Sequence, residues 1–269
     1  MRKVNLIILI FTLGLFIFSC KPKDETNPKI FLNGDNPKRV ILQSYYDDDG
    51  AYADDNFDGS DITSTMSVVY DIPGMPDGIT DWKNLEGVTS NAGTYTVTYT
   101  VTDKAENITS LDRIVTVYNQ SERFAVDYYV DKSSLNELNS SSLDYTGVAM
   151  SVSPDSKVNN RILFPKLSQI SGLKVYGNIR DSIIVTVPDT VWRKFIDIPY
   201  QEMEGTMSNG NIYDFHIEGC SNLDGNPNND SYFTETFFFY KFIIKYTIDR
   251  LGGGGQDLND EVIEVYTKI

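Results

Sequence analysis

Residues 94–102, TYTVTYTVT, decide the fold of the first half of this chain. Tyr95, Val97, Tyr99 and Val101 alternate strictly with threonines. A period of two over such a run, with β-branched residues on both faces, predicts a β-strand with one buried and one solvated face. The chain around this stretch is therefore expected to form a β-sheet.

The segments on either side predict an antiparallel partner for this strand. Gly93 precedes it, residues 103–107 (DKAEN) are turn-forming, and residues 113–118 (RIVTVY) read as the returning strand. Further short apolar runs separated by turn residues extend from 29 to 119. This first domain is therefore expected to consist of short antiparallel strands.

Four segments of this domain, in order, resemble an immunoglobulin-like domain that occurs repeatedly in bacterial surface proteins. They are FLNGDNP (31–37), DDDGAYADDNFDGSDIT (47–63), AGTYTVTYTVTDKAENITS (92–110) and RIVTVYN (113–119). The resemblance implies a β-sandwich over residues 29–119 that serves as a spacer or recognition module, with no catalytic residue to carry over. One departure is YDIPGMPDGITDWKNLEG, between Val69 and Val88, which is longer and richer in Pro and Gly than the turn of that family.

Residues 120–269 are expected to form a second antiparallel β domain, either a barrel or a sandwich, which makes the whole chain all-β. Its candidate strands are 124–130, 146–152, 173–176, 182–187, 212–217, 234–248 and 261–269. Alternating apolar residues from Phe238 to Ile248 predict that 234–248 is one long strand, bent midway. Only 134–139 and 189–195 hint at short helices.

The N-terminus predicts a lipoprotein export signal. Arg2 and Lys3 precede an apolar run from Val4 to Phe18, which is too short to span a bilayer as a helix. Residues 1–19 are therefore expected to be removed from the mature protein.

The ending IFSC resembles the bacterial lipobox, which implies that Cys20 becomes the new N-terminus and carries a diacylglycerol on its thiol. Residues 20–28 would then be a lipidated, flexible tether. Asp24 and Glu25 resemble the acidic pair that directs Bacteroidetes lipoproteins to the outer face of the outer membrane; any solvated tether is the competing interpretation.

Charge excludes several classes of partner. The formal charge is −15, and removal of Arg2 and Lys3 with the signal makes it −17. Nucleic acid is therefore not an expected partner, because phosphate binding needs a basic surface. Attachment to the membrane must depend on the lipid at Cys20 rather than on a polybasic patch.

An immunoglobulin-like module followed by an unrelated β domain resembles the Bacteroidetes outer-membrane lipoproteins encoded beside TonB-dependent nutrient importers, as in starch-utilisation systems. The resemblance implies a lipid-anchored protein that faces the cell exterior. It also implies a TonB-dependent transporter and its substrate-binding lipoprotein as partners, and a glycan or a peptide as ligand.

The acidic stretch 47–61 is the strongest candidate metal site. Asp54, Asn56 and Asp58 offer oxygen ligands at the alternate spacing that calcium loops use, and Asp61 is a fourth candidate ligand in the same stretch. The EF-hand pattern fails because no glutamate follows at the required distance. Asx-turns between strands are the competing interpretation, so a structural Ca²⁺ ion is one of two alternatives. The loop 222–230 is similarly rich in oxygen but reads as an exposed loop.

The inserted loop is the strongest candidate contact surface. It places Trp82 near Met75 and Ile79, and a tryptophan on a loop can hold a sugar face, a peptide or a protein partner. The alternative is a loop that folds Trp82 into its own small core.

Catalysis has little support in the sequence. The single histidine, His216, lies in a predicted strand. The other cysteine of the chain is Cys20, whose thiol would carry the lipid, so Cys220 has no partner for a disulfide. The preferred hypothesis is a non-enzymatic accessory or binding subunit in nutrient uptake. An adhesin or assembly component is the alternative, and a carboxylate-based glycoside hydrolase is a weaker one.

Overall fold

The structure, a computed structural model, describes residues 23–72, 87–131, 134–136, 141–142, 147–168, 170–185, 190–207, 210–219, 231–235, 240–251 and 259–269. These residues form antiparallel strands joined by turns and short 3₁₀ helices, which confirms the all-β prediction. By contacts, the chain divides into two compact units. The first comprises Met1–Lys38, Tyr46–Gly87 and Tyr95–Val115, and the second comprises Arg39–Tyr45, Val88–Thr94 and Thr116–Ile269.

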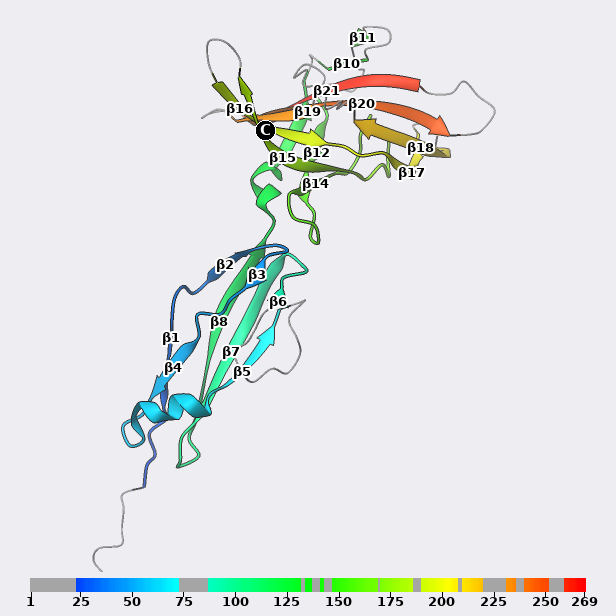
Figure 1. Cartoon of the computed structure of the whole chain (residues 1–269). Helices are drawn as coiled ribbons and strands as arrows, with labels where there is room; N and C mark the ends of the chain where they lie inside the picture. The colour runs from blue at the N-terminus through cyan, green and yellow to red at the C-terminus, as the bar shows by residue number, and fades with distance from the viewer. Residues whose placement is uncertain are drawn as a thin grey trace, which may run out of the picture. The chain divides into compact units, whose positions relative to one another are not determined.

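The N-terminal module consists of three small sheets (Figure 1). Its elements are β1 (Lys29–Leu32), β2 (Lys38–Ile41), β3 (Tyr45–Tyr46), β4 (Ala51–Asp54), η2 (Gly59–Thr65), β5 (Ser67–Asp71), β6 (Gly87–Val88), β7 (Gly93–Thr102) and β8 (Ile108–Tyr118). Four strands pair in the order β2-β8-β7-β5, while β1 pairs with β4 and β3 pairs with β6.

Strand β7 confirms the alternation that was read from its sequence. Val97, Tyr99 and Val101 are fully buried, while the intervening threonines are partly exposed. The predicted turn after β7 is also present. The returning strand β8 begins earlier than predicted, because polar side chains extend the pairing: Thr98 Oγ1 donates to Asp112 Oδ1 at 2.8 Å, and Thr100 Oγ1 and Ser110 Oγ share a hydrogen bond.

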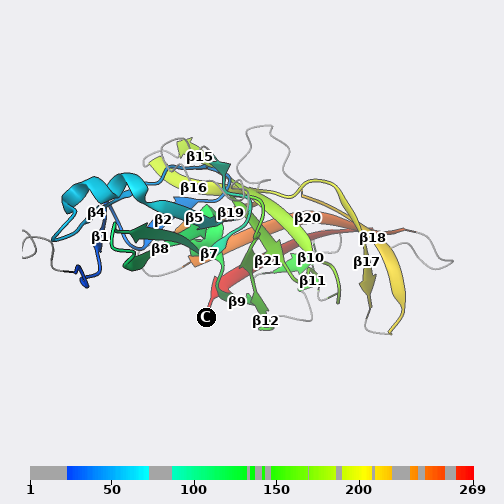
Figure 2. The same cartoon turned by 90° about the horizontal axis from the view of Figure 1, so that it is seen from below.

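The C-terminal region forms one large antiparallel sheet (Figure 2). Its main path runs β11-β10-β21-β20-β19-β16-β15-β14-β13; β9 pairs with β12 and β21, and β18 pairs with β17 and β20. The elements are η4 (Gln120–Phe124), β9 (Asp127–Val130), β10 (Leu135–Asn136), β11 (Ser141–Ser142), β12 (Ala149–Ser151), β13 (Ser153–Pro154), β14 (Arg161–Phe164), β15 (Val175–Val185), β16 (Thr190–Asp197), β17 (Gln201–Thr206), β18 (Ile212–Gly219), β19 (Ser231–Glu235), β20 (Tyr240–Leu251) and β21 (Asn259–Lys268).

The core of this region is apolar and joins residues that are distant in sequence. Phe124, Phe164, Phe215 and Tyr266 are among its largest fully buried side chains. Strand β9 pairs with the end of β21, so the first and last strands of the region are neighbours. Burial of such side chains stabilises the sheet by about 1.5–3 kcal/mol each.

Two sequence predictions in this region are wrong. Residues 234–248 are not one strand: β19 and β20 pair with each other, with Glu235 opposite Tyr240, so the chain reverses between them. The apolar alternation continues across the reversal without a Gly or Pro to mark it. The two helix predictions fail as well, because Leu135–Asn136 and Thr190–Asp197 are strands held by pairing with β21 and β15.

Candidate functional site

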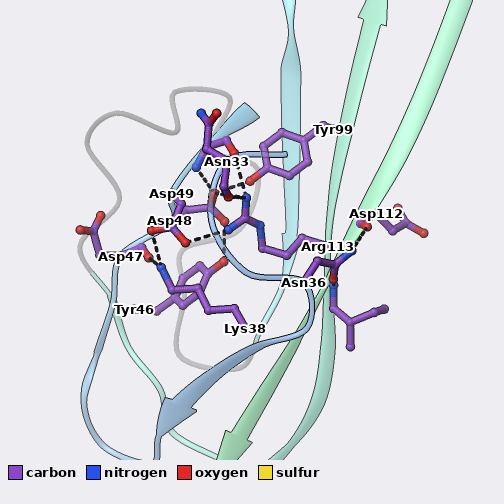
Figure 3. Close-up of polar contacts among 12 residues, drawn as sticks. Asn33, Asn36, Lys38, Tyr46, Asp47, Asp48, Asp49, Tyr99, Asp112 and Arg113 are labelled. Carbon is purple, nitrogen blue, oxygen red and sulfur yellow. Dashed lines mark hydrogen bonds and ion pairs between the residues drawn. The ribbon is translucent and has the colours of Figure 1, made fainter. Parts of the chain in front are cut away.

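The centre of the N-terminal module is a buried carboxylate, Asp48, in the connection between β3 and β4 (Figure 3). The phenol groups of Tyr46 and Tyr99 both donate hydrogen bonds to it. The backbone N–H of Gly50 donates to Asp48 Oδ1 at 2.6 Å. Three donors from two separate parts of the module therefore converge on one carboxylate.

Arg113, on β8, carries the opposite charge into the same core. Its side chain is fully buried, and its Nη2 lies 3.9 Å from Asp48 Oδ1. That nitrogen also donates to the carbonyls of Asn33 at 2.6 Å and Gly50 at 2.8 Å. Nη1 pairs with Asp49 Oδ2 at 3.1 Å. The guanidinium thereby joins β8 to the loops that follow β1 and β3.

The environment of this network keeps its ionisable groups in fixed states. Burial, and then the hydrogen bond to Asp48, raise the pKa of Tyr46 and of Tyr99, so both phenols remain neutral donors. Burial is the largest single influence and lowers the pKa of Arg113, but Asp48, Tyr99, Tyr46 and Asp49 together outweigh it, so the pKa is raised overall. Partial burial raises the pKa of Asp49, but the hydrogen bonds and positive charges of Lys38 and Arg113 together lower it by more, so the net shift is downward. We interpret the network as a structural element rather than a reaction centre.

The structure does not gather the four residues that the sequence suggested as calcium ligands. Asp58 is paired with Lys104, whose Nζ lies 2.8 Å from its Oδ1 and whose backbone N–H donates to Oδ2 at 2.9 Å. Asp54 ends β4 with an exposed side chain, Asn56 is exposed in the following turn, and Asp61 is exposed in the first turn of η2.

A different acidic group comes together at one end of the module. Carboxylate oxygens of Asp24, Asp55 and Asp103 all lie within 4.8 Å of one another. Asp55 falls inside the acidic stretch 47–61, but Asp24 comes from the N-terminal segment and Asp103 from the turn after β7. No local spacing links the three, so sequence reasoning missed Asp24 and Asp103. In the sequence, Asp24 reads as part of the tether and Asp103 as part of the turn after residues 94–102.

The remaining predicted residues, Cys20, Met75, Ile79 and Trp82, lie outside the described residues. Lipidation and the contact loop therefore stay predictions. In the part of the chain that the structure describes, no helix combines the length and apolar character needed to cross a membrane.

Comparison with known proteins gives little support for an assignment. No protein-family model matches the sequence, and no curated protein matches it significantly. A solved structure of a lipoprotein from Bacteroides thetaiotaomicron aligns with 90% of this chain and 100% of its own, at 13% identity and a TM-score of 0.27. A likeness at that TM-score carries no argument about fold or function.

Proposed function

We propose that this protein is a non-enzymatic, lipid-anchored surface protein whose N-terminal module is a spacer that presents the C-terminal β region to its partners. The observation that supports this proposal is that the chain enters the module beside one end of β8 and leaves it at the other end. Asn107 and Thr109, at the start of β8, hold the entering segment, and the chain leaves the module after the last residue of the same strand.

The entry is held by side-chain bonds to the backbone of the entering segment. Thr109 Oγ1 donates to the carbonyl of Pro28 at 2.7 Å. Asn107 Nδ2 donates to the carbonyls of Asp24 and Thr26 at 3.4 and 3.3 Å. The segment that would connect to the lipid is therefore attached beside the β7–β8 turn.

The exit lies at the other end of a long strand. β8 contains 11 residues, and an antiparallel strand rises about 3.4 Å per residue, which gives about 35 Å between its ends. A chain that enters at one end of such a strand and leaves at the other gains length from the module. This supports a spacer more than a compact catalytic domain.

The proposal extends to nutrient uptake. We place the protein on the exterior of the outer membrane as an accessory or binding subunit beside a TonB-dependent transporter and its substrate-binding lipoprotein, with a glycan or peptide as ligand. The single histidine of the sequence, His216, lies tilted against Tyr200 with ring centroids 4.1 Å apart, and its Nε2 lies 3.7 Å from Glu218 Oε2.

The test is purification of the full chain, with its own signal, from detergent-solubilised outer membranes, with partners identified by mass spectrometry. We expect a lipid on Cys20, cleavage by protease added to intact cells, and enrichment of a TonB-dependent transporter. A Cys20→Ala variant cannot be lipidated and is the matched control, which should lose both the lipid and the enrichment. Recovery of unlipidated wild-type protein, or of equal partner sets with both forms, would overturn the proposal.

A further inference from the structure

We propose that Asp24, Asp55 and Asp103 form a calcium site that fixes the N-terminal segment to the N-terminal module. The calcium site itself stands on the geometry of the module, and its consequence for the tether rests on the lipid anchor and surface location proposed above. It also replaces Asp54, Asn56, Asp58 and Asp61 with a different set of ligands.

Three separate segments meet at this site (Figure 1). Asp24 precedes β1, Asp55 follows β4, and Asp103 follows β7. The start of the described chain, η2 and the β7–β8 turn lie at the same end of the module in Figure 1. A cation held by all three carboxylates would therefore connect parts of the module that are far apart in sequence.

The spacing of the carboxylates fits a single ion. Ca²⁺ binds oxygen at about 2.3–2.6 Å, so two oxygens on the same ion are at most about 5 Å apart. The three carboxylate oxygens satisfy this limit, because they lie within 4.8 Å of one another. The donors are all oxygens, which suits a hard cation and not the nitrogen and sulfur sites typical of zinc.

A second observation points to a ligand. Asp55 is only 6% exposed, and its Oδ1 is completely buried without a hydrogen-bond partner among the described residues. Its Oδ2 is already used, since it accepts from the backbone N–H groups of Phe57 and Asp58 at 2.8 and 3.2 Å. A buried carboxylate oxygen without a donor is costly, and a metal ion would satisfy it.

The other two carboxylates are held in place by neutral donors. Asp103, also 6% exposed, accepts from the backbone N–H groups of Ala105 and Asn107 and from the Asn107 side chain at 2.7–2.9 Å. Asp24 accepts from the backbone N–H of Thr26 at 3.0 Å. These bonds orient the carboxylates toward fixed positions.

No basic side chain in the described part of the chain pairs with these three carboxylates. Among the described residues, no ion pair includes any member of the group, and the neighbouring Lys104 is committed to Asp58. Two buried carboxylates this close repel each other strongly without a counter-ion. A divalent cation offsets that repulsion, with water or backbone carbonyls completing its six to eight ligands.

The position of Asp24 gives the site its consequence. Asp24 lies four residues after Cys20, the predicted site of lipidation. With Ca²⁺ bound, the segment from Asp24 to β1 is held on the module, so the free tether shortens to the few residues before Asp24. Calcium outside the cell would thus set how tightly the module is held to its anchor.

The test uses the full mature chain in detergent, treated with a chelator and titrated with CaCl₂ or MgCl₂ by calorimetry. We expect one Ca²⁺ per chain, with a dissociation constant of about 10⁻⁴–10⁻³ M or tighter, as in extracellular modules. Mg²⁺ should bind more weakly. Ca²⁺ should raise the melting temperature and protect the backbone N–H groups of residues 24–27 from hydrogen exchange.

Variants separate a site from an acidic surface. Asp55→Asn and Asp24→Asn should each weaken Ca²⁺ binding about tenfold or more, because each removes one charged ligand. In chelator, Asp55→Asn should melt no lower than wild type, because it relieves buried repulsion. Because Asp24 precedes the first strand, Asp24→Asn is expected to fold, and it tests the site even if Asp55→Asn does not fold. Asp54→Asn, an exposed neighbour, is the matched control and should bind as wild type does.

Several outcomes would overturn the proposal. Wild-type protein that binds no Ca²⁺, or that binds Mg²⁺ equally well, would contradict a calcium site. Unchanged binding in Asp24→Asn and Asp55→Asn would place the ion elsewhere. Binding of Ca²⁺ without protection of the amides of residues 24–27 would refute the attachment of the N-terminal segment.

Discussion

Both halves of this molecule bury apolar side chains, but the N-terminal module also buries the ion pair of Arg113 and Asp48 in its core. The N-terminal module surrounds a buried arginine and a buried aspartate, with tyrosine hydroxyls as donors. The C-terminal sheet buries a continuous apolar cluster, in which Phe164, Phe215 and Ile244 are fully covered. A small sandwich with short strands has little apolar area, and directional bonds fix its loops, whereas a large sheet can depend on shape complementarity. The N-terminal module should therefore lose most stability when a buried charge is removed, and the C-terminal sheet when its apolar packing is disturbed.

Removal of the buried guanidinium should have the largest effect. Arg113→Met preserves apolar length but leaves Asp48 charged and buried without its counter-ion, which costs about 3–5 kcal/mol of unfolding free energy. Urea unfolding followed by hydrogen exchange in β7 and β8 measures the loss. Arg39→Met is the matched control, because Arg39 is exposed and its contact with Glu122 at 3.9 Å is worth less than about 1 kcal/mol. Equal losses of unfolding free energy in Arg113→Met and Arg39→Met would show that the buried charge of Arg113 has no special role in the N-terminal module.

An added methyl group should test the C-terminal core. A Cβ on Gly205 would lie 2.8 Å from Ile170 Cγ2, 2.8 Å from Leu173 Cδ2 and 3.0 Å from Phe215 Cε2. Gly205→Ala should therefore destabilise the sheet by about 1–3 kcal/mol through overpacking. At a strand position with free space, the same Gly→Ala substitution would instead stabilise the protein, because glycine loses more backbone entropy on folding. Glu204→Ala, at the exposed neighbouring position, should change little, and a stabilised Gly205→Ala would show that this core is loosely packed.

These two halves also differ in what their sequence predicts. The β7–β8 hairpin was predictable because its strands are adjacent, its alternation is strict, and its turn residues are distinctive. In the C-terminal region, β9 pairs with β21 through Val130 and Tyr266, and nothing local indicates that partnership. The reversal between β19 and β20 was missed for a related reason, since period two continues through it.

The candidate metal site illustrates the same limit. The acidic stretch 47–61 predicted oxygen ligands and contains Asp55, but its neighbours Asp54 and Asp58 point to solvent or to Lys104. Asp24 and Asp103 join Asp55 only because the sandwich topology brings the start of β1 beside the β7–β8 turn. Composition therefore predicted a concentration of carboxylates in this part of the chain, and only the fold shows which of them lie together.

A phenol donor should matter less than the guanidinium. Tyr99→Phe removes one of the donors to Asp48 and should cost about 1–2 kcal/mol at neutral pH. The folded pKa of Tyr99 is raised above its unfolded value, so its contribution is complete below about pH 10 and is lost as the pH rises further. Wild type should thus lose stability in alkali more steeply than Tyr99→Phe, as measured by melting temperature against pH. Parallel profiles would show that the phenol does not titrate with unfolding.

The smallest effect should come from Asp58, where the module depends on an exposed ion pair. The hydrogen bond from the Lys104 side chain, followed by that from its backbone N–H, lowers the pKa of Asp58. Its contribution is then present above the unfolded pKa of about 3.9 and disappears as the pH falls through the folded value. Asp58→Asn keeps an acceptor for the backbone N–H and loses only the charge, so its melting temperature should be slightly below wild type at neutral pH and equal to it in acid.

High salt should reduce the same small difference, because an exposed pair is screened. A difference that persists unchanged in acid and in salt would mean that the Asp58 carboxylate stabilises the loop by shape and not by charge. In that case the exposed end of the module would follow the same packing rule as the C-terminal sheet, and the contrast between the two halves would be confined to Arg113 and Asp48.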